Sequence, residues 1–167
     1  YCEYDNDINN VATYGRLYNW YSVNDSRNIA PAGWHVPSDA EWQTLVDYLG
    51  GNTIAGGKMK EAGTAHWISP NTGATNESGF SGLPSGYREK SGNYLHVGNY
   101  ADFWSSTEFS GYLARNHLLA YNSSEIYANG NDYYKQGGFS VRCVKDVEEN
   151  TVTDIDGNIY QTVTIGT

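Results

Sequence analysis

Apolar residues recur with the period of an α-helix over residues 39–49. Four apolar residues share one face of this segment: Trp42, Leu45, Val46 and Leu49. Ser38 precedes the segment and Glu41 lies three residues later, which is the Ser-x-x-Glu pattern of a capping box. Two glycines follow the last apolar position and favour an end to the helix there. The pattern therefore predicts one capped helix over 39–49, preceded by a short buried strand at 33–37.

A second helical pattern covers residues 14–23. Its apolar stripe consists of four residues at helical spacing: Tyr14, Leu17, Tyr18 and Tyr21. Between residues 54 and 87, glycine and proline interrupt every apolar run. We therefore expect long loops in that region, with a short helix at 58–62.

From residue 100 onward the apolar positions favour strands. We expect strands at 102–106, 112–119, 124–127 and 139–144. Farther along, two β-branched runs flank Asp156-Gly157, which is the turn signal of a β-hairpin over 151–166. Together these patterns predict an α+β domain over residues 1–146, with two helices packed on a twisted antiparallel sheet and long loops. A separate segment, 147–167, follows it.

Composition changes this picture in two ways. Leu, Ile and Val are sparse, so the 15 tyrosines and five tryptophans must supply much of the core. The formal net charge of −9 disfavours binding to nucleic acid, because it repels phosphate groups. No stretch approaches the roughly 18 consecutive apolar residues of a membrane-spanning helix, so we expect no membrane span.

The sequence lacks common catalytic and metal-binding motifs. Its four histidines are scattered without His-x-x-x-His spacing, and neither Gly-x-Ser-x-Gly nor Cys-x-x-Cys occurs. His35 lies between Trp34 and Val36 just before a proline, which favours a structural histidine. We therefore expect no enzyme activity and no cofactor.

Two pairs of residues are candidates for a calcium site and for a disulfide, respectively. Asp5 and Asp7 are candidate calcium ligands, because carboxylate oxygens suit a hard cation. The residues after them lack the Gly and Glu of an EF-hand loop, which favours a solvated turn instead. Cys2 and Cys143 either form a disulfide that closes a very long loop or remain buried free thiols.

Five motifs in a fixed order resemble one protein family. They are YGRLYNWY (14–21), GWHVPSDAEW (33–42), NTGATNESGF (71–80), FWSSTE (103–108) and GFSVRCV (138–144). This set resembles the Fibrobacter succinogenes major paralogous domain, found mainly in surface and secreted proteins of Bacteroidetes and Fibrobacteres. The resemblance implies a C-type-lectin-like fold, related to sulfatase-modifying factors and to the variable proteins of diversity-generating retroelements. It also implies a bacterial protein that is extracellular or at the cell surface.

The chain departs from those relatives at their functional positions. Sulfatase-modifying enzymes depend on a cysteine pair near the C-terminal end, and here only Cys143 is present there. The Glu-Pro-Asn, Gln-Pro-Asp and Trp-Asn-Asp motifs of calcium-dependent sugar-binding lectins are lacking too. The resemblance therefore implies the fold more firmly than a function. We assign framework roles to four residues: Trp34, Trp42, Trp104 and Arg142.

The segment 109–134 is rich in Tyr, Asn, Ser and Gly, a composition typical of antibody binding loops. The corresponding region forms the variable ligand-binding face of the retroelement-diversified relatives. The candidate ligand-binding residues are Phe109, Tyr112, Arg115, His117, Tyr121, Asn122, Tyr127, Asn129, Asn131, Tyr133 and Tyr134. The alternative is that these residues simply populate exposed strands and turns.

We expect a non-catalytic binding or adhesion module whose ligand is a protein or a glycan. In the alternative, the chain is a structural repeat of a polymeric surface filament, assembled by self-association through residues 151–166. That segment resembles the beginning of the same family, so it is either the start of a further repeat or a docking strand. An enzyme of the sulfatase-modifying type is the third alternative.

Overall fold

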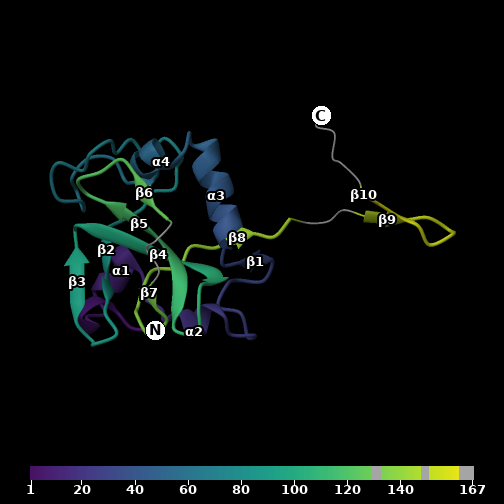
Figure 1. Cartoon of the computed structure of the whole chain (residues 1–167), viewed down its shortest axis with the longest axis horizontal. Coiled ribbons are helices and arrows are strands. Elements are labelled where there is room, and N and C mark those ends of the chain that lie inside the picture. Colours follow the sequence, from purple (N-terminus) through teal and green to yellow (C-terminus); the bar gives the residue numbers. More distant parts are fainter. Residues whose placement is uncertain (129–132, 148–150, 162–167) are drawn as a thin grey trace.

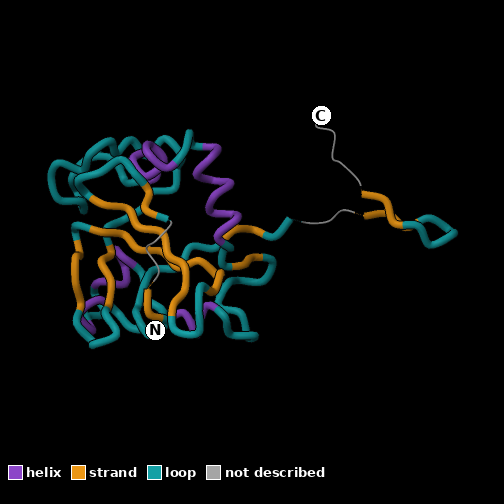
Figure 2. Tube along the Cα trace, in the orientation of Figure 1, coloured by secondary structure: helices purple, strands orange, loops and turns teal. Residues whose placement is uncertain are grey.

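The computed structural model describes residues 1–128, 133–147 and 151–161. Figures 1 and 2 show short helices around a central sheet, with a hairpin near the C-terminal end. The helices are the 3₁₀ turn η1 (Tyr4–Asn6), α1 (Asn10–Tyr14), α2 (Trp20–Val23), α3 (Asp39–Tyr48) and α4 (Asn52–Met59). The strands are β1 (Trp34–His35), β2 (Ser85–Arg88), β3 (Tyr94–Val97), β4 (Tyr100–Glu108), β5 (Leu113–Ala120), β6 (Ile126–Tyr127), β7 (Tyr133–Tyr134), β8 (Val144–Lys145), β9 (Thr151–Thr153) and β10 (Ile159–Gln161).

The central sheet has the strand order β3-β2-β4-β5-β6, and β7 also pairs with β5. β4 and β5 run antiparallel, from the Tyr100–Ala120 pair to the Glu108–Ala114 pair. β2 joins β4 in the parallel sense, whereas the other pairs of this sheet are antiparallel. The predicted combination of helices with a mainly antiparallel sheet is therefore confirmed.

The sheet is covered on both faces, which gives the domain two hydrophobic cores. Successive side chains of a strand point to opposite faces, so Phe103 and Trp104 of β4 enter different cores. Phe103 lies under α3 and α4, where its ring centre is 5.9 Å from that of Trp42. Trp104 lies on the side of α2, with its ring centre 4.4 Å from that of Phe139. Aromatic rings therefore fill both cores, as the composition predicts.

The capped helix is confirmed as α3. The Glu41 side chain accepts a hydrogen bond from the Ser38 N–H at 2.8 Å, and Ser38 Oγ accepts one from the Glu41 N–H at 3.4 Å. Trp42 follows directly and is 2 % exposed. Because both partners of the box lie within four residues, the helix start is fixed by local sequence.

The helix predicted over 14–23 is wrong. α1 ends before Gly15, whose φ of +75° falls in the left-handed region that favours glycine. The chain then runs extended, so that Leu17 bridges to residue 2 and Tyr18 to residue 139. α2 begins only after these bridges, because its N-cap is residue 19. Pairing with distant segments overrides the helical spacing of the tyrosines.

Other expected elements are displaced. The short helix predicted at 58–62 begins earlier, as α4, and its two glycines allow close packing. A Cβ at Gly56 would lie 2.2 Å from the Glu125 carbonyl oxygen, and one at Gly57 would lie 2.4 Å from that of Gly73. The strand predicted at 139–144 is reduced to isolated bridges followed by β8. β3 has no counterpart among the predicted strands.

The burial expected for the strand at 33–37 and the disulfide also need correction. Trp34 is 39 % exposed, because β1 is a two-residue surface strand that, within the described residues, pairs only with β8. Of the other framework residues, Trp42 and Trp104 are buried, and Arg142 is exposed but bonds to the Phe80 carbonyl oxygen. The Cys2–Cys143 bridge is not formed, and both thiols are free. Cys2 belongs to a backbone bridge near the N-terminus, while Cys143 packs on the core around Trp104.

The hairpin signal near the C-terminal end is confirmed in its described part. β9 pairs with β10 in the antiparallel sense across the turn at 154–158. The Asp154 carboxylate accepts hydrogen bonds from the N–H groups of Asp156 and Asn158, which closes the turn. Residues 162–166 of the predicted hairpin lie outside the described residues.

Lys60 is fully buried at the end of α4, without a carboxylate partner among the described residues. Its Nζ donates hydrogen bonds to the carbonyl oxygens of Thr72 at 2.9 Å, Ala120 at 2.8 Å and Ser123 at 2.8 Å. Burial lowers the pKa of Lys60 to about 8, so the ammonium form still predominates at neutral pH. Its three N–H groups therefore tie the loop after α4 to the turn between β5 and β6.

We predict that Lys60→Met lowers the free energy of unfolding by about 3 kcal/mol or more, because three carbonyl oxygens lose their donor in a buried site. Urea unfolding followed by tryptophan fluorescence measures this loss. Lys58→Met is the matched control, since Lys58 pairs with the exposed Glu77 carboxylate at 3.4 Å and should cost less than about 0.5 kcal/mol. Equal stability of the two variants would contradict the role of Lys60.

Candidate binding surfaces

The predicted ligand-binding residues do not form one surface. Phe109 and Tyr112 lie in the turn before β5, and β7 pairs with the first residues of β5. Tyr121 and Asn122 lie in the turn after β5, and Tyr127 of β6 pairs near that same end. β5 has eight residues and is therefore about 26 Å long, at about 3.3 Å per residue. The candidate residues therefore divide between two ends of the sheet.

Two of the predicted residues are not available to a ligand in the way that the sequence suggests. His117 is 1 % exposed, stacks on the Trp42 ring at 4.6 Å and hydrogen-bonds to the Asp39 carboxylate at 3.1 Å. Tyr121 is half-buried and packs against the core under α3 and α4. The assignment of His117 to a ligand-contacting face is therefore wrong. Asn122 is exposed, and Asn129 and Asn131 lie outside the described residues.

Four aromatic residues gather at the end of the sheet where β5 begins, and we call this group the aromatic end: Phe109, Tyr112, Tyr133 and Tyr134. Phe109, Tyr112 and Tyr134 are 51, 75 and 42 % exposed, respectively. β7 brings the last two tyrosines to the turn before β5, because Tyr134 pairs with Leu113 and Tyr133 with Ala114. Strand pairing therefore brings these four aromatic residues to one end of the sheet.

Cations lie over two of these exposed rings. The Arg115 guanidinium is 4.6 Å from the centre of the Phe109 ring, and Lys90 Nζ is 3.4 Å from the centre of the Tyr134 ring. Such cation–π contacts orient the rings at modest energy, about 0.5–1 kcal/mol at an exposed site. The aromatic end therefore presents ordered rings together with positive charge.

Lys135 is a buried residue that fixes the main chain of the aromatic end. It is 4 % exposed, and its Nζ donates to the Glu108 carboxylate and to the Gly111 carbonyl oxygen, the latter at 3.3 Å. The same Nζ lies 4.6 Å from the Trp20 ring centre. The Lys135 N–H donates to the Tyr112 carbonyl oxygen at 3.0 Å. One buried ammonium group thus joins α2, the turn before β5 and the segment after β7.

Tyr133 connects the aromatic end to the core. Its ring centre lies 4.9 Å from that of Phe139 and 5.7 Å from that of Tyr87. Burial raises the pKa of both phenols, so both tyrosines are neutral at physiological pH. Beside Tyr133 and Tyr134, residues 89–91 border a shallow hollow of about 310 Å³. The surface therefore combines a rigid base with a small depression.

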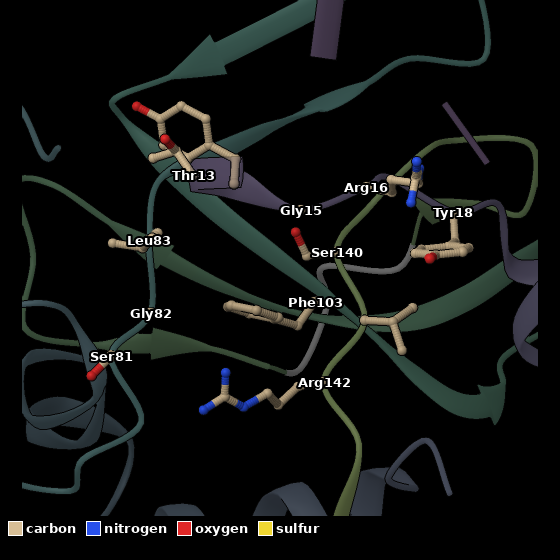
Figure 3. A pocket seen from close by; sticks show the side chains of 12 residues that line it. Thr13, Gly15, Arg16, Tyr18, Ser81, Gly82, Leu83, Phe103, Ser140 and Arg142 are labelled. Carbon is tan, nitrogen blue, oxygen red and sulfur yellow. The ribbon is translucent and has the colours of Figure 1, made fainter. Parts of the chain in front are cut away.

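A separate cleft of about 370 Å³ opens between α1 and the extended segment at 140–142 (Figure 3). It is lined by Thr13, Tyr14, Gly15, Arg16, Tyr18, Ser81, Gly82, Leu83, Phe103, Ser140, Val141 and Arg142. Among the described residues that line it, two are arginines and none is acidic. The cleft lies outside the segment 109–134, and sequence analysis does not identify it because four segments far apart in the sequence build it.

The remaining polar candidates have structural partners. Asp7 accepts hydrogen bonds from the main-chain and side-chain N–H groups of Asn9 at 2.9 and 2.8 Å, which is the geometry of a local turn. Within the described ranges, no group of three or more His, Cys, Asp or Glu residues could hold a metal ion. The His35 ring nitrogens lie 2.6 Å from Asp146 and 2.7 Å from Glu41, and these hydrogen bonds raise its pKa. His35 is therefore a satisfied structural histidine, as predicted.

The described part of the chain contains no helix with the length and apolar character needed to cross a membrane.

Comparisons with known proteins identify a family for this chain. No curated protein and no solved structure matches the sequence. A family model described as Fibrobacter succinogenes major domain matches residues 1–145, which span the central sheet and both cores. The chain therefore belongs to the Fibrobacter succinogenes major domain family.

Proposed function

We propose that the domain is a non-catalytic binding or adhesion module and that its aromatic end contacts a protein or glycan ligand. The observation that carries this proposal is the exposure of three rings on a base fixed by Lys135. Aromatic rings supply large contact areas with few rotatable bonds, so an ordered ring loses little entropy on binding. Cations at two rings add recognition of polar or anionic groups.

We also propose that the protein is not an enzyme and that it acts at the bacterial cell surface or outside the cell. Burial raises the pKa of the Cys143 thiol, which disfavours the thiolate that a nucleophilic cysteine requires. This supports a binding role over a sulfatase-modifying activity. The resemblance to lectin-like binding domains and the surface or secreted proteins of the family support a C-type-lectin-like module at the bacterial cell surface or outside the cell.

We predict that changing Phe109, Tyr112 and Tyr134 together to Ala strongly weakens binding to a ligand found with the wild-type chain on glycan and protein arrays. Each exposed ring at an interface centre is worth about 1–2 kcal/mol, so affinity should fall about 100-fold or more. Tyr48→Ala is the matched control, because Tyr48 is 86 % exposed on α3 and lies outside the aromatic end. Unchanged binding by the triple variant would contradict the assigned surface.

The second candidate function is self-association through β9 and β10. Four of its apolar residues are strongly exposed: Val152, Ile155, Ile159 and Tyr160. Within the described part of the chain, these strands pair only with each other. An isolated two-stranded hairpin is marginally stable in water, and its open edges favour pairing with another strand. These observations favour a repeat that docks on a neighbouring copy, as in a surface filament.

Sedimentation velocity over a range of protein concentrations tests this second candidate. We expect the wild-type chain to form larger species as concentration rises and Val152→Lys/Ile159→Lys to remain monomeric, because charge on the hairpin disfavours strand pairing. Ile8→Lys serves as the control, since Ile8 is 62 % exposed near the N-terminus. A wild-type chain that stays monomeric throughout would exclude assembly through the hairpin.

A further inference from the structure

Arg142 is held in a fixed position at the cleft. Its Nη2 donates a hydrogen bond to the Phe80 carbonyl oxygen at 2.9 Å, and its guanidinium lies 4.6 Å from the centre of the Phe80 ring. Figure 3 shows Arg142 and Ser140 extending from the same segment, with Phe103 between them. An arginine already ordered in this way loses little side-chain entropy when it binds a ligand.

The charge balance of the cleft favours an anion. In the part of the chain that the structure describes, Arg142 has no carboxylate partner, and its guanidinium carries five N–H donors. Arg16 is partly balanced, because its Nε lies 3.2 Å from the Glu3 carboxylate. The cleft therefore concentrates positive charge in a chain whose formal net charge is −9.

The rest of the lining suits a polar ring. Thr13, Ser81 and Ser140 supply hydroxyl groups, and Ser140 is 8 % exposed with its Oγ 2.9 Å from that of Ser85. Phe103 and Leu83 supply apolar surface in the same cleft. A volume of about 370 Å³ lies at the lower end of the range for small-molecule sites, about 300–1,000 Å³. Hydroxyl groups, an aromatic ring and an arginine together match a small ligand that carries both hydroxyls and a negative charge.

We propose that this cleft binds a sugar acid of about one ring, with its carboxylate on Arg142 and its hydroxyls toward Thr13, Ser81 and Ser140. A planar guanidinium and a carboxylate form paired, charge-assisted hydrogen bonds, which are the strongest contacts that this lining offers. The site is distinct from the aromatic end and rests on different observations. Its test therefore uses different variants, and failure of one proposal leaves the other standing.

Isothermal titration of the full chain with D-glucuronate, D-glucose and D-glucose 6-phosphate at constant ionic strength tests this proposal. We expect saturable binding of glucuronate, at least about tenfold tighter than that of the other two sugars. Arg142→Gln should weaken glucuronate binding about tenfold or more, because it removes the charged partner. Arg27→Gln is the matched control, since it removes one positive charge at an exposed arginine that pairs with Asp25 outside the cleft.

Thr13→Trp blocks the cleft without changing a core residue, so it tests the site independently of Arg142. Thr13 is exposed on α1, so the new ring fills the cleft without changing a buried contact, and glucuronate affinity should again fall about tenfold or more. Loss in both cleft variants with normal binding by Arg27→Gln supports the site. Unchanged affinity in Thr13→Trp overturns the proposal whatever Arg142→Gln shows. Absence of glucuronate binding to the wild-type chain, or tighter binding of the phosphate sugar, overturns the assignment to a sugar acid.

Discussion

Two buried ammonium groups fix the loops at opposite ends of the strand pair β4–β5. Lys60 donates to three carbonyl oxygens where β5 ends, and Lys135 bonds to Glu108 and Gly111 where β4 passes into β5. The chain is poor in aliphatic residues and rich in loops, so apolar packing alone leaves many loop carbonyl groups to be satisfied. A lysine can serve three acceptors from different segments at once, which makes it an efficient tie between loops.

This constraint explains how exposed aromatic residues can be ordered outside the core. Lys135 fixes the main chain beside Tyr112, and Tyr133 packs on Phe139 in the core on the side of α2. The outer rings of the aromatic end therefore stand on a rigid base, which lowers the entropy cost of binding. A different contact orders Arg142 in the cleft of Figure 3, where Phe80 holds its guanidinium and four distant segments meet.

Sequence predicts the parts of this fold that depend on neighbouring residues. α3 is an example, because Ser38 and Glu41 lie within one turn of each other, and the strands β4 and β5 follow their apolar pattern closely. It fails at 14–23, where bridges to distant residues replace a helix, and at His117, whose strand face is set by the pairing of β5. Both anchoring lysines also escape prediction, since a lysine is ordinarily a surface residue and no local pattern marks a buried one.

Hydrogen exchange of Lys135→Met beside the wild-type chain tests most directly whether a buried ammonium group orders the aromatic end. The account predicts that amides at 109–113 and 133–135 exchange at least about tenfold faster in the variant, a change of about 1.4 kcal/mol or more in local opening, while those of α3 keep their protection. Lys90→Met, which removes an exposed cation over Tyr134, should leave these backbone amides unchanged. Equal protection of 109–113 in Lys135→Met and the wild-type chain would contradict the account.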